Sequence, residues 1–173
     1  MTAPAPLPEP ARPSWTPAVV IGAVVTFALH APALLDHVLW LPMCCGLGCT
    51  GAPVGMVPAA IALRREPGMG ASSGFAVAFI GAGLGAIGLA AVTLLRGFEL
   101  QPGTIAALRD GWVASGYTSE QAGQMLLVLE EGAPVIVVVT AALVALGAGV
   151  MGAVLAGWTD RRLRRRAAPP PPR

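Results

Sequence analysis

Three cysteines, at positions 44, 45 and 49, are the residues of this chain most suited to chemistry. In a helix Cys45 and Cys49 share a face because they are four residues apart, whereas Cys44 points about 100° away. Two histidines precede them, His30 and His37, and a tight turn there brings imidazoles near the thiols. Thiolate and imidazole are ligands that suit Cu(I) or Zn²⁺. The spacing therefore predicts a candidate soft-metal site.

The same cysteines have simpler interpretations. A lone Cys-x-x-x-Cys lacks the second ligand pair of zinc motifs, and cysteine is a small residue that suits close helix contacts. Helix packing is therefore the leading interpretation. Metal binding is the first alternative, and disulfide exchange with a partner in an oxidising compartment, or lipidation, is the second.

Other kinds of site have no matching pattern in the sequence. The chain has two histidines, no Gly-rich phosphate loop between a strand and a helix, and no Ser/His/Asp set in a nucleophile pattern. No acidic or basic residue occupies the middle of an apolar stretch, which argues against a proton-coupled transporter. We expect no enzyme activity, no cofactor and no nucleic-acid partner.

Four apolar stretches must position these residues. Charged residues make up only 12% of the chain and the mean hydropathy is +0.70, which excludes an ordinary soluble domain. The stretches are residues 17–35, 38–63, 71–95 and 133–158. Each is long enough to cross a bilayer as a helix. The sequence predicts an all-α, integral membrane four-helix bundle between a Pro/Ala-rich tail at 1–16 and a basic, Pro-rich tail at 159–173, with a soluble insert at 96–132.

The charges between the stretches predict the topology. All eleven basic residues are arginines, and arginine excess marks cytoplasmic segments. Arg64 and Arg65 follow the second stretch and an arginine cluster follows the fourth, whereas Asp36 and an acidic insert follow the first and third. We therefore expect an inner-membrane protein with both termini cytoplasmic and the insert outside.

The insert carries two helix signals. Thr104 is a candidate cap for a first amphipathic helix. Thr118 and Gln121 form a capping-box pattern for a second, which Gly132 and Pro134 separate from the last stretch or join to it through a bend. We expect an amphipathic hairpin that lies on the outer membrane face or caps the bundle, or that docks a partner protein.

Glycine and alanine recur at intervals of four in the apolar stretches, which lets helix backbones approach closely. The packing residues that we expect are Gly51, Gly55, Gly74, Gly81, Gly85, Ala145, Gly149, Ala153 and Gly157. They would pack within one chain or in a homo-oligomer. The alternative is that these smooth faces line a narrow pore or a sliding contact.

The basic tail holds five arginines in six positions: Arg161, Arg162, Arg164, Arg165 and Arg166. The simplest interpretation is an orientation signal directly after a membrane span. The alternative is attraction of anionic lipid, to which each arginine near the surface contributes about 1 kcal/mol.

The layout resembles small, uncharacterised four-span bacterial membrane proteins with Gly-rich helices, of which Gly-Phe-Ala-Val-Ala-Phe-Ile-Gly at residues 74–81 is typical. The resemblance implies an architecture and brings no activity with it. We expect a non-enzymatic multi-pass protein that acts as a scaffold or accessory subunit, with the lipid bilayer, a second copy or another membrane protein as partner. The alternatives are a metal-handling or thiol-redox protein and a small channel or transporter subunit.

Overall fold

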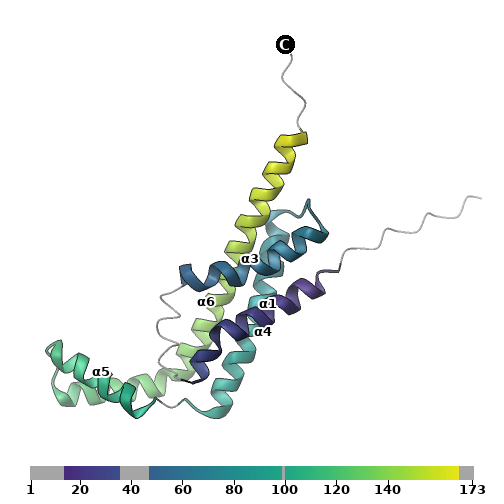
Figure 1. Cartoon of the computed structure of the whole chain (residues 1–173). Helices are drawn as coiled ribbons and strands as arrows, with labels where there is room; N and C mark the ends of the chain where they lie inside the picture. The colour runs from purple at the N-terminus through teal and green to yellow at the C-terminus, as the bar shows by residue number, and fades with distance from the viewer. Residues whose placement is uncertain (1–13, 36–46, 99, 168–173) are drawn as a thin grey trace, which may run out of the picture.

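The structure is a computed structural model that describes residues 14–35, 47–98 and 100–167, with the backbone alone at 47–51. This part of the chain is helical throughout and contains no strand. In chain order the helices are α1 (Thr16–His30), the 3₁₀ helix η1 (Ala31–Leu34), α3 (Leu47–Arg65), α4 (Ala71–Arg96), α5 (Pro102–Ala114) and α6 (Ser119–Ala167) (Figure 1). The predicted all-α class is confirmed.

Three helical segments are long and apolar enough to cross a membrane: Thr16–Leu34, Ala71–Arg96 and Ser119–Ala167. The first two match the predicted stretches 17–35 and 71–95 to within one residue. The third contains the predicted stretch 133–158 as its middle. The remaining stretch, 38–63, begins outside the described residues, and α3, which covers its later part, is not among the three.

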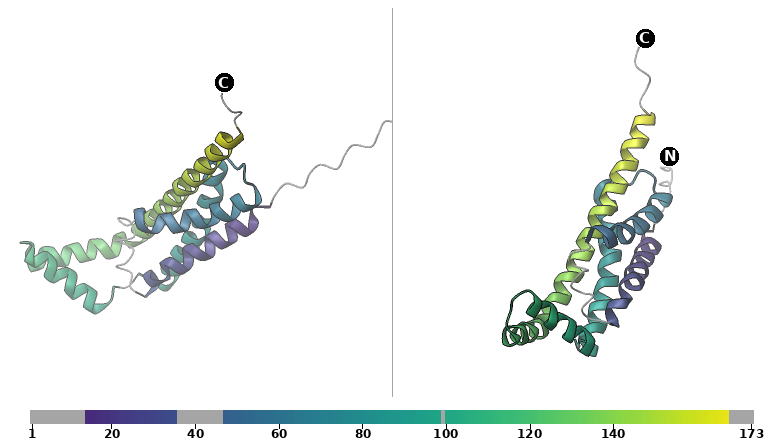
Figure 2. Two further views of the ribbon diagram at one scale, coloured as in Figure 1. Left: turned by 45° about the horizontal axis from the view of Figure 1, so that its top comes forward. Right: turned by 60° about the vertical axis from the view of Figure 1, so that its left-hand side comes forward.

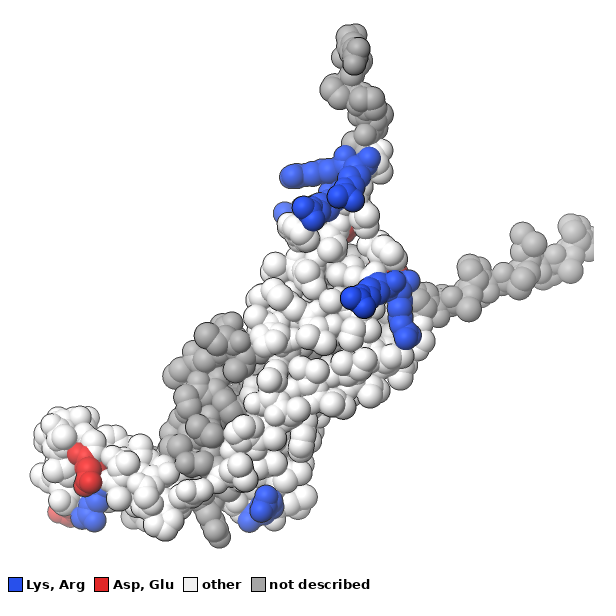
Figure 3. Space-filling view, in the orientation of Figure 1, with Lys and Arg blue, Asp and Glu red and all other residues white. Residues whose placement is uncertain are grey.

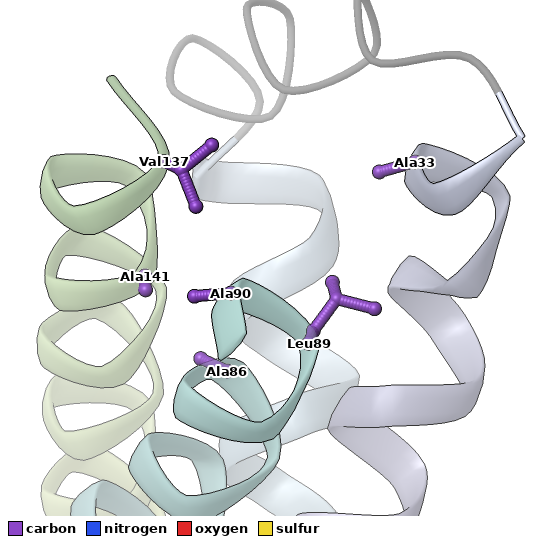
Figure 4. Close-up of a cluster of buried hydrophobic side chains, with 6 residues drawn as sticks. All are labelled: Ala33, Ala86, Leu89, Ala90, Val137 and Ala141. Atoms are coloured by element: carbon purple, nitrogen blue, oxygen red, sulfur yellow. The ribbon is translucent and has the colours of Figure 1, made fainter. Parts of the chain in front are cut away.

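Helix α4 lies at the centre of the bundle. It packs most extensively on α6 and α1 and also contacts α3, which in turn packs on α6. Figures 1 and 2 show α1 and α6 on different sides of α4. One cluster of buried side chains joins these three helices, where Leu89 of α4 and Val137 of α6 meet Ala33 of η1 among the alanines of α4 and α6 (Figure 4).

The bundle has small side chains inside and large apolar ones outside. Most of the buried hydrophobic residues are alanines. The exposed faces of α1, α4 and α6 instead carry bulky residues, including Val20, Val24, Leu84, Ile87, Val138, Val150 and Val154. Water would penalise such a surface, because soluble proteins rarely expose large contiguous apolar patches. Hydrocarbon does not penalise it, and small residues inside allow helices to approach where burial from water gives no driving force.

The buried hydroxyl groups are satisfied within their own helices. Thr26, Thr93 and Thr140 each donate a hydrogen bond to the carbonyl oxygen four residues earlier, over 2.8, 3.0 and 2.7 Å. This arrangement removes the need for water as a partner. These buried hydroxyl groups can therefore be accommodated in a bundle that is surrounded by hydrocarbon.

Helix α5 and residues 119–132 of α6 form an arm that extends away from the bundle (Figures 1 and 2). The predicted capping box at its tip is confirmed: Thr118 N–H donates to Gln121 Oε1 over 2.9 Å, and Gln121 N–H donates to Thr118 Oγ1 over 3.2 Å. The predicted cap at Thr104 is wrong. Helix α5 begins earlier, at Pro102, because a proline in the first turn loses no intrahelical hydrogen bond.

Helix α6 continues from the arm into the bundle without a break. Its 49 residues include Gly132 and Pro134, the two residues that the sequence predicted would separate two helices or bend their junction. Proline cannot donate the hydrogen bond to the carbonyl four residues earlier, that of Glu130, and such a gap is a usual cause of a kink. Figure 1 shows the corresponding change of direction between the green and yellow-green parts of α6.

Candidate functional site

The described residues hold only part of the predicted metal site. Cys44, Cys45 and His37 lie outside them, and Cys49 is described by its backbone alone, in the first turn of α3. Among the residues that the structure describes, no three His, Cys, Asp or Glu side chains come close enough to hold a metal ion. The cysteine cluster therefore remains a prediction.

His30 is the one predicted ligand whose side chain is described. It ends α1 with only 3% of its surface exposed. Its Nδ1 lies 2.7 Å from the carbonyl oxygen of Thr26, and because a carbonyl only accepts, Nδ1 carries the proton. In the neutral ring Nε2 is then an acceptor, and it is buried with no hydrogen-bond partner among the residues that the structure describes. A buried imidazole nitrogen with a free lone pair is chemically suited to ligate a metal ion.

Glycines form the closest contact between α4 and α6. A methyl group added to Gly74 would lie 2.6 Å from the carbonyl oxygen of Gly152, and one added to Gly152 would lie 2.5 Å from the Cβ of Ala78. The obstructing atoms are mostly backbone, which no rotamer change can move. The two helices are therefore as close here as glycine permits.

Similar contacts recur along the α4–α6 pair and join α1 to α4 and α3 to α6. A methyl group on Gly81 of α4 would lie 3.1 Å from the carbonyl oxygen of Val19 in α1, and one on Gly149 of α6 would meet the Phe75 ring at 2.7 Å. The predicted packing residue Gly85 approaches α1, and Gly55 of α3 approaches the backbone of α6. Ala145 is buried, whereas Ala153 and Gly157 are half-buried. Gly51 has no described side-chain surroundings.

One end of the bundle gathers the start of α1 and the ends of α3 and α6. Trp15 Nε1 donates a hydrogen bond to Glu66 Oε2 over 3.0 Å in a partly buried position, and Arg65 donates to the carbonyl oxygen of Ser14 over 3.3 Å. Figure 3 shows most of the visible basic side chains gathered at this end, whereas one more lies at the opposite end of the bundle and one on the arm.

Two arginines of the basic tail have different contact partners. Arg164 forms an ion pair with Asp160, with the Nε atom 3.0 Å from Oδ2. Arg162 instead lies over the Trp158 ring, with its guanidinium carbon 4.4 Å from the ring centroid. We did not predict either contact, although both pairs are four residues apart and such pairs meet on a helix surface.

The arm carries a groove that the sequence did not predict. It has a volume of about 830 Å³ and lies between the end of α5 and the first turns of α6. Its lining includes Trp112, Tyr117, Met125, Val128 and Val135. We call it the arm groove. A second groove of about 600 Å³ runs between the outward faces of α4 and α6 and is lined almost wholly by apolar side chains.

Comparisons with protein-family models, curated proteins and solved structures find no match for this chain. The resemblance to four-span bacterial membrane proteins therefore stays a prediction, and function must be argued from the geometry.

Proposed function

We propose that this protein is a four-span, non-enzymatic subunit of the bacterial inner membrane that docks another membrane protein, or a second copy of itself, on its arm. Three helices long enough to span and the bulky apolar exterior support the membrane location. Helix α3, together with the residues before it, supplies the fourth span of this proposal.

The charge distribution supports cytoplasmic termini. The start of α1 and the ends of α3 and α6 share one end of the bundle, because Arg65 contacts Ser14 and one groove is lined by both Leu63 and Arg162. The arm instead carries acidic residues, including Glu120, Glu130 and Glu131. Arginine excess on one side is the usual sign of the cytoplasmic side.

The arm groove is the observation that carries the docking function. Among the residues that line it are Trp112, Tyr117 and Met125, and aromatic residues and methionine are enriched at protein interfaces. Val128, in its wall, is 69% exposed. Because α6 runs unbroken from this groove into the bundle, the groove sits on a helix that the bundle holds in place.

Two neighbouring substitutions on α6 test the proposal. Val128→Glu places a charge in the arm groove, whereas Leu127→Glu places the same charge beside it, because Leu127 is 60% exposed but does not line the groove. The measurement is native mass spectrometry of the full chain extracted from its own membranes in mild detergent. We expect the wild type to retain a partner or a second copy, Val128→Glu to lose it, and Leu127→Glu to keep it.

Two results would contradict the proposal. The first is a wild-type chain that is monomeric in its own membranes, or a complex that both variants lose equally. The second is substrate turnover by the isolated protein, or ion flux in liposomes that depends on its sequence.

His30 favours a second candidate function, metal handling with the cysteines at 44, 45 and 49. Its Nε2 is buried and has no hydrogen-bond partner within the described part of the chain. The same mass spectra test this function: a bound metal mass would be expected in the wild type and absent from the Cys44/Cys45/Cys49→Ser variant and from His30→Ala. A metal-free wild type after Cu(I) or Zn²⁺ loading would refute it.

A further inference from the structure

A groove of about 250 Å³ lies at the arginine-rich end of the bundle, between the end of α3 and the last turns of α6. We call it the tail groove. Six residues that line it carry the argument: Leu63 and Pro67 on the α3 side, and Trp158, Arg162, Leu163 and Arg166 on α6. This groove is separate from the arm groove, which lies near the other end of α6.

The tail groove combines an apolar wall with two cationic groups. Arg162 and Arg166 are four residues apart and therefore share one face of α6. The Arg162 guanidinium lies over the Trp158 ring, so its face is in contact while its N–H donors lie in the plane of the group. Leu63, Pro67 and Leu163 supply apolar surface beside these donors.

The positive charge of the tail groove is not neutralised by neighbouring carboxylates. Asp160 pairs with Arg164, and the residues that line the groove include no aspartate or glutamate. Within the described residues, no ion pair involves Arg162 or Arg166. The groove therefore presents two guanidinium groups to an anion.

The position of the tail groove, at the end of the apolar stretch of α6, indicates which kind of anion it binds. Trp158 ends the apolar stretch of α6 and is half exposed, as suits an indole ring at the level of lipid headgroups. A phosphate held by the two arginines would be at that level too, and the hydrocarbon chains attached to it would lie along the exposed valines of α6, Val150 and Val154. A free phosphate would leave this apolar wall unused.

We propose that the tail groove binds one anionic phospholipid, with its phosphate on Arg162 and Arg166 and its glycerol and upper chains on Trp158, Leu163 and Leu63. This inference rests on the membrane topology proposed above, in which this end of the bundle is cytoplasmic, and basic pockets between spans on that side are a known type of lipid-headgroup site. This proposal distinguishes two of the five tail arginines from the rest. A diffuse attraction would treat all five alike.

The test compares two pairs of substitutions that remove the same charge from the same helix. Arg162→Gln with Arg166→Gln removes the groove arginines, and Arg161→Gln with Arg165→Gln removes two arginines that do not line the groove. Phosphatidylglycerol or phosphatidylcholine is titrated into the purified full chain in zwitterionic detergent, and native mass spectrometry counts the bound lipid. Circular dichroism confirms that each variant is folded.

We expect the wild type to bind one phosphatidylglycerol in preference to phosphatidylcholine. Binding should be about 30-fold weaker in the Arg162/Arg166 variant and weakened only a few-fold, about 3-fold, in the Arg161/Arg165 variant, which keeps only long-range attraction. Trp158→Ala should also weaken binding, although it removes no charge. Inorganic phosphate and glycerol phosphate, which lack acyl chains, should fail to compete at equal concentration.

Four results would overturn the proposal. Equal losses in the two arginine pairs would mean diffuse attraction, and no loss in either pair would mean that the arginines are not used. Equal binding of phosphatidylcholine would exclude selection by charge. Displacement by glycerol phosphate would mean a site for soluble phosphates and not for a lipid.

Discussion

A single methyl group added at Gly74 should weaken the contact between α4 and α6. In Gly74→Ala the new Cβ would lie 2.6 Å from the carbonyl oxygen of Gly152 and would overlap the methyl group of Ala156. A separation of 3.4 Å is ordinary for such a contact, so relief of the Gly152 contact alone would move the helices apart by about 0.8 Å, and the nearer Ala156 methyl would require more. Overpacking of this kind costs about 1–3 kcal/mol. We expect the free energy of unfolding to fall by that amount.

The assay is unfolding by sodium dodecyl sulfate in mixed micelles, followed by circular dichroism. Gly83→Ala on the same helix is the control, because its methyl group would meet only the Ala145 methyl at 3.8 Å, and we expect a change within about 0.5 kcal/mol. Gly152→Ala added to Gly74→Ala should cost less than it does alone, since the helices have already separated. A Gly74→Ala protein as stable as the wild type, or a Gly83→Ala protein equally weakened, would refute the reasoning.

Three further predictions concern single interactions. Trp15→Phe should lower the free energy of unfolding by about 1 kcal/mol, because it removes the hydrogen bond to Glu66; Glu66→Gln, which keeps an acceptor, should lower it less in the same assay. Thr118→Ala should cost the start of α6 about 1 kcal/mol of local stability, seen as faster amide hydrogen exchange at Gln121 and unchanged exchange within the bundle. Pro134→Ala restores an N–H to the i−4 hydrogen-bond ladder of α6, so spin labels on the arm and on the bundle should show a changed separation by pulsed electron resonance; an identical distance would mean that packing, not the proline, sets the bend.

Hydropathy predicted the apolar cores of the helices because a bilayer requires a minimum length of apolar chain. The predicted stretches 17–35 and 71–95 agree closely with Thr16–Leu34 and Ala71–Arg96. The stretch 133–158 did not reveal the full length of α6. The helix continues at both ends into segments with polar and charged residues, where the hydropathy is low. Hydropathy reports where a helix is in an apolar surrounding and does not report where it begins or ends.

Local spacing predicted some contacts and could not predict others. The capping box follows from residues three apart, and the Trp158–Arg162 pair could have been found from residues four apart. The Trp15–Glu66 hydrogen bond joins residues 51 apart. The arm groove and the tail groove depend on which helices are neighbours. Those features follow from tertiary packing, about which a single sequence gives only the glycine and alanine pattern.

Helix α6 connects the arm groove to the tail groove, and its middle is held firmly. At Gly152 it contacts the backbone of α4 closely enough to exclude a methyl group, and Ala148 contacts Gly55 of α3 in the same way. Coupling between the two ends of α6 would need the helix to slide or rotate through these contacts, which closely packed backbones oppose.

The arm groove at Val128 and the tail groove at Arg162 are about 50 Å apart along α6 at 1.5 Å per residue. Their effects should therefore add: a chain with Val128→Glu and the Arg162/Arg166 substitutions should lose partner and lipid by the factors of the separate variants, measured by native mass spectrometry. A lipid affinity that changed with Val128→Glu alone would instead show that α6 moves within the bundle.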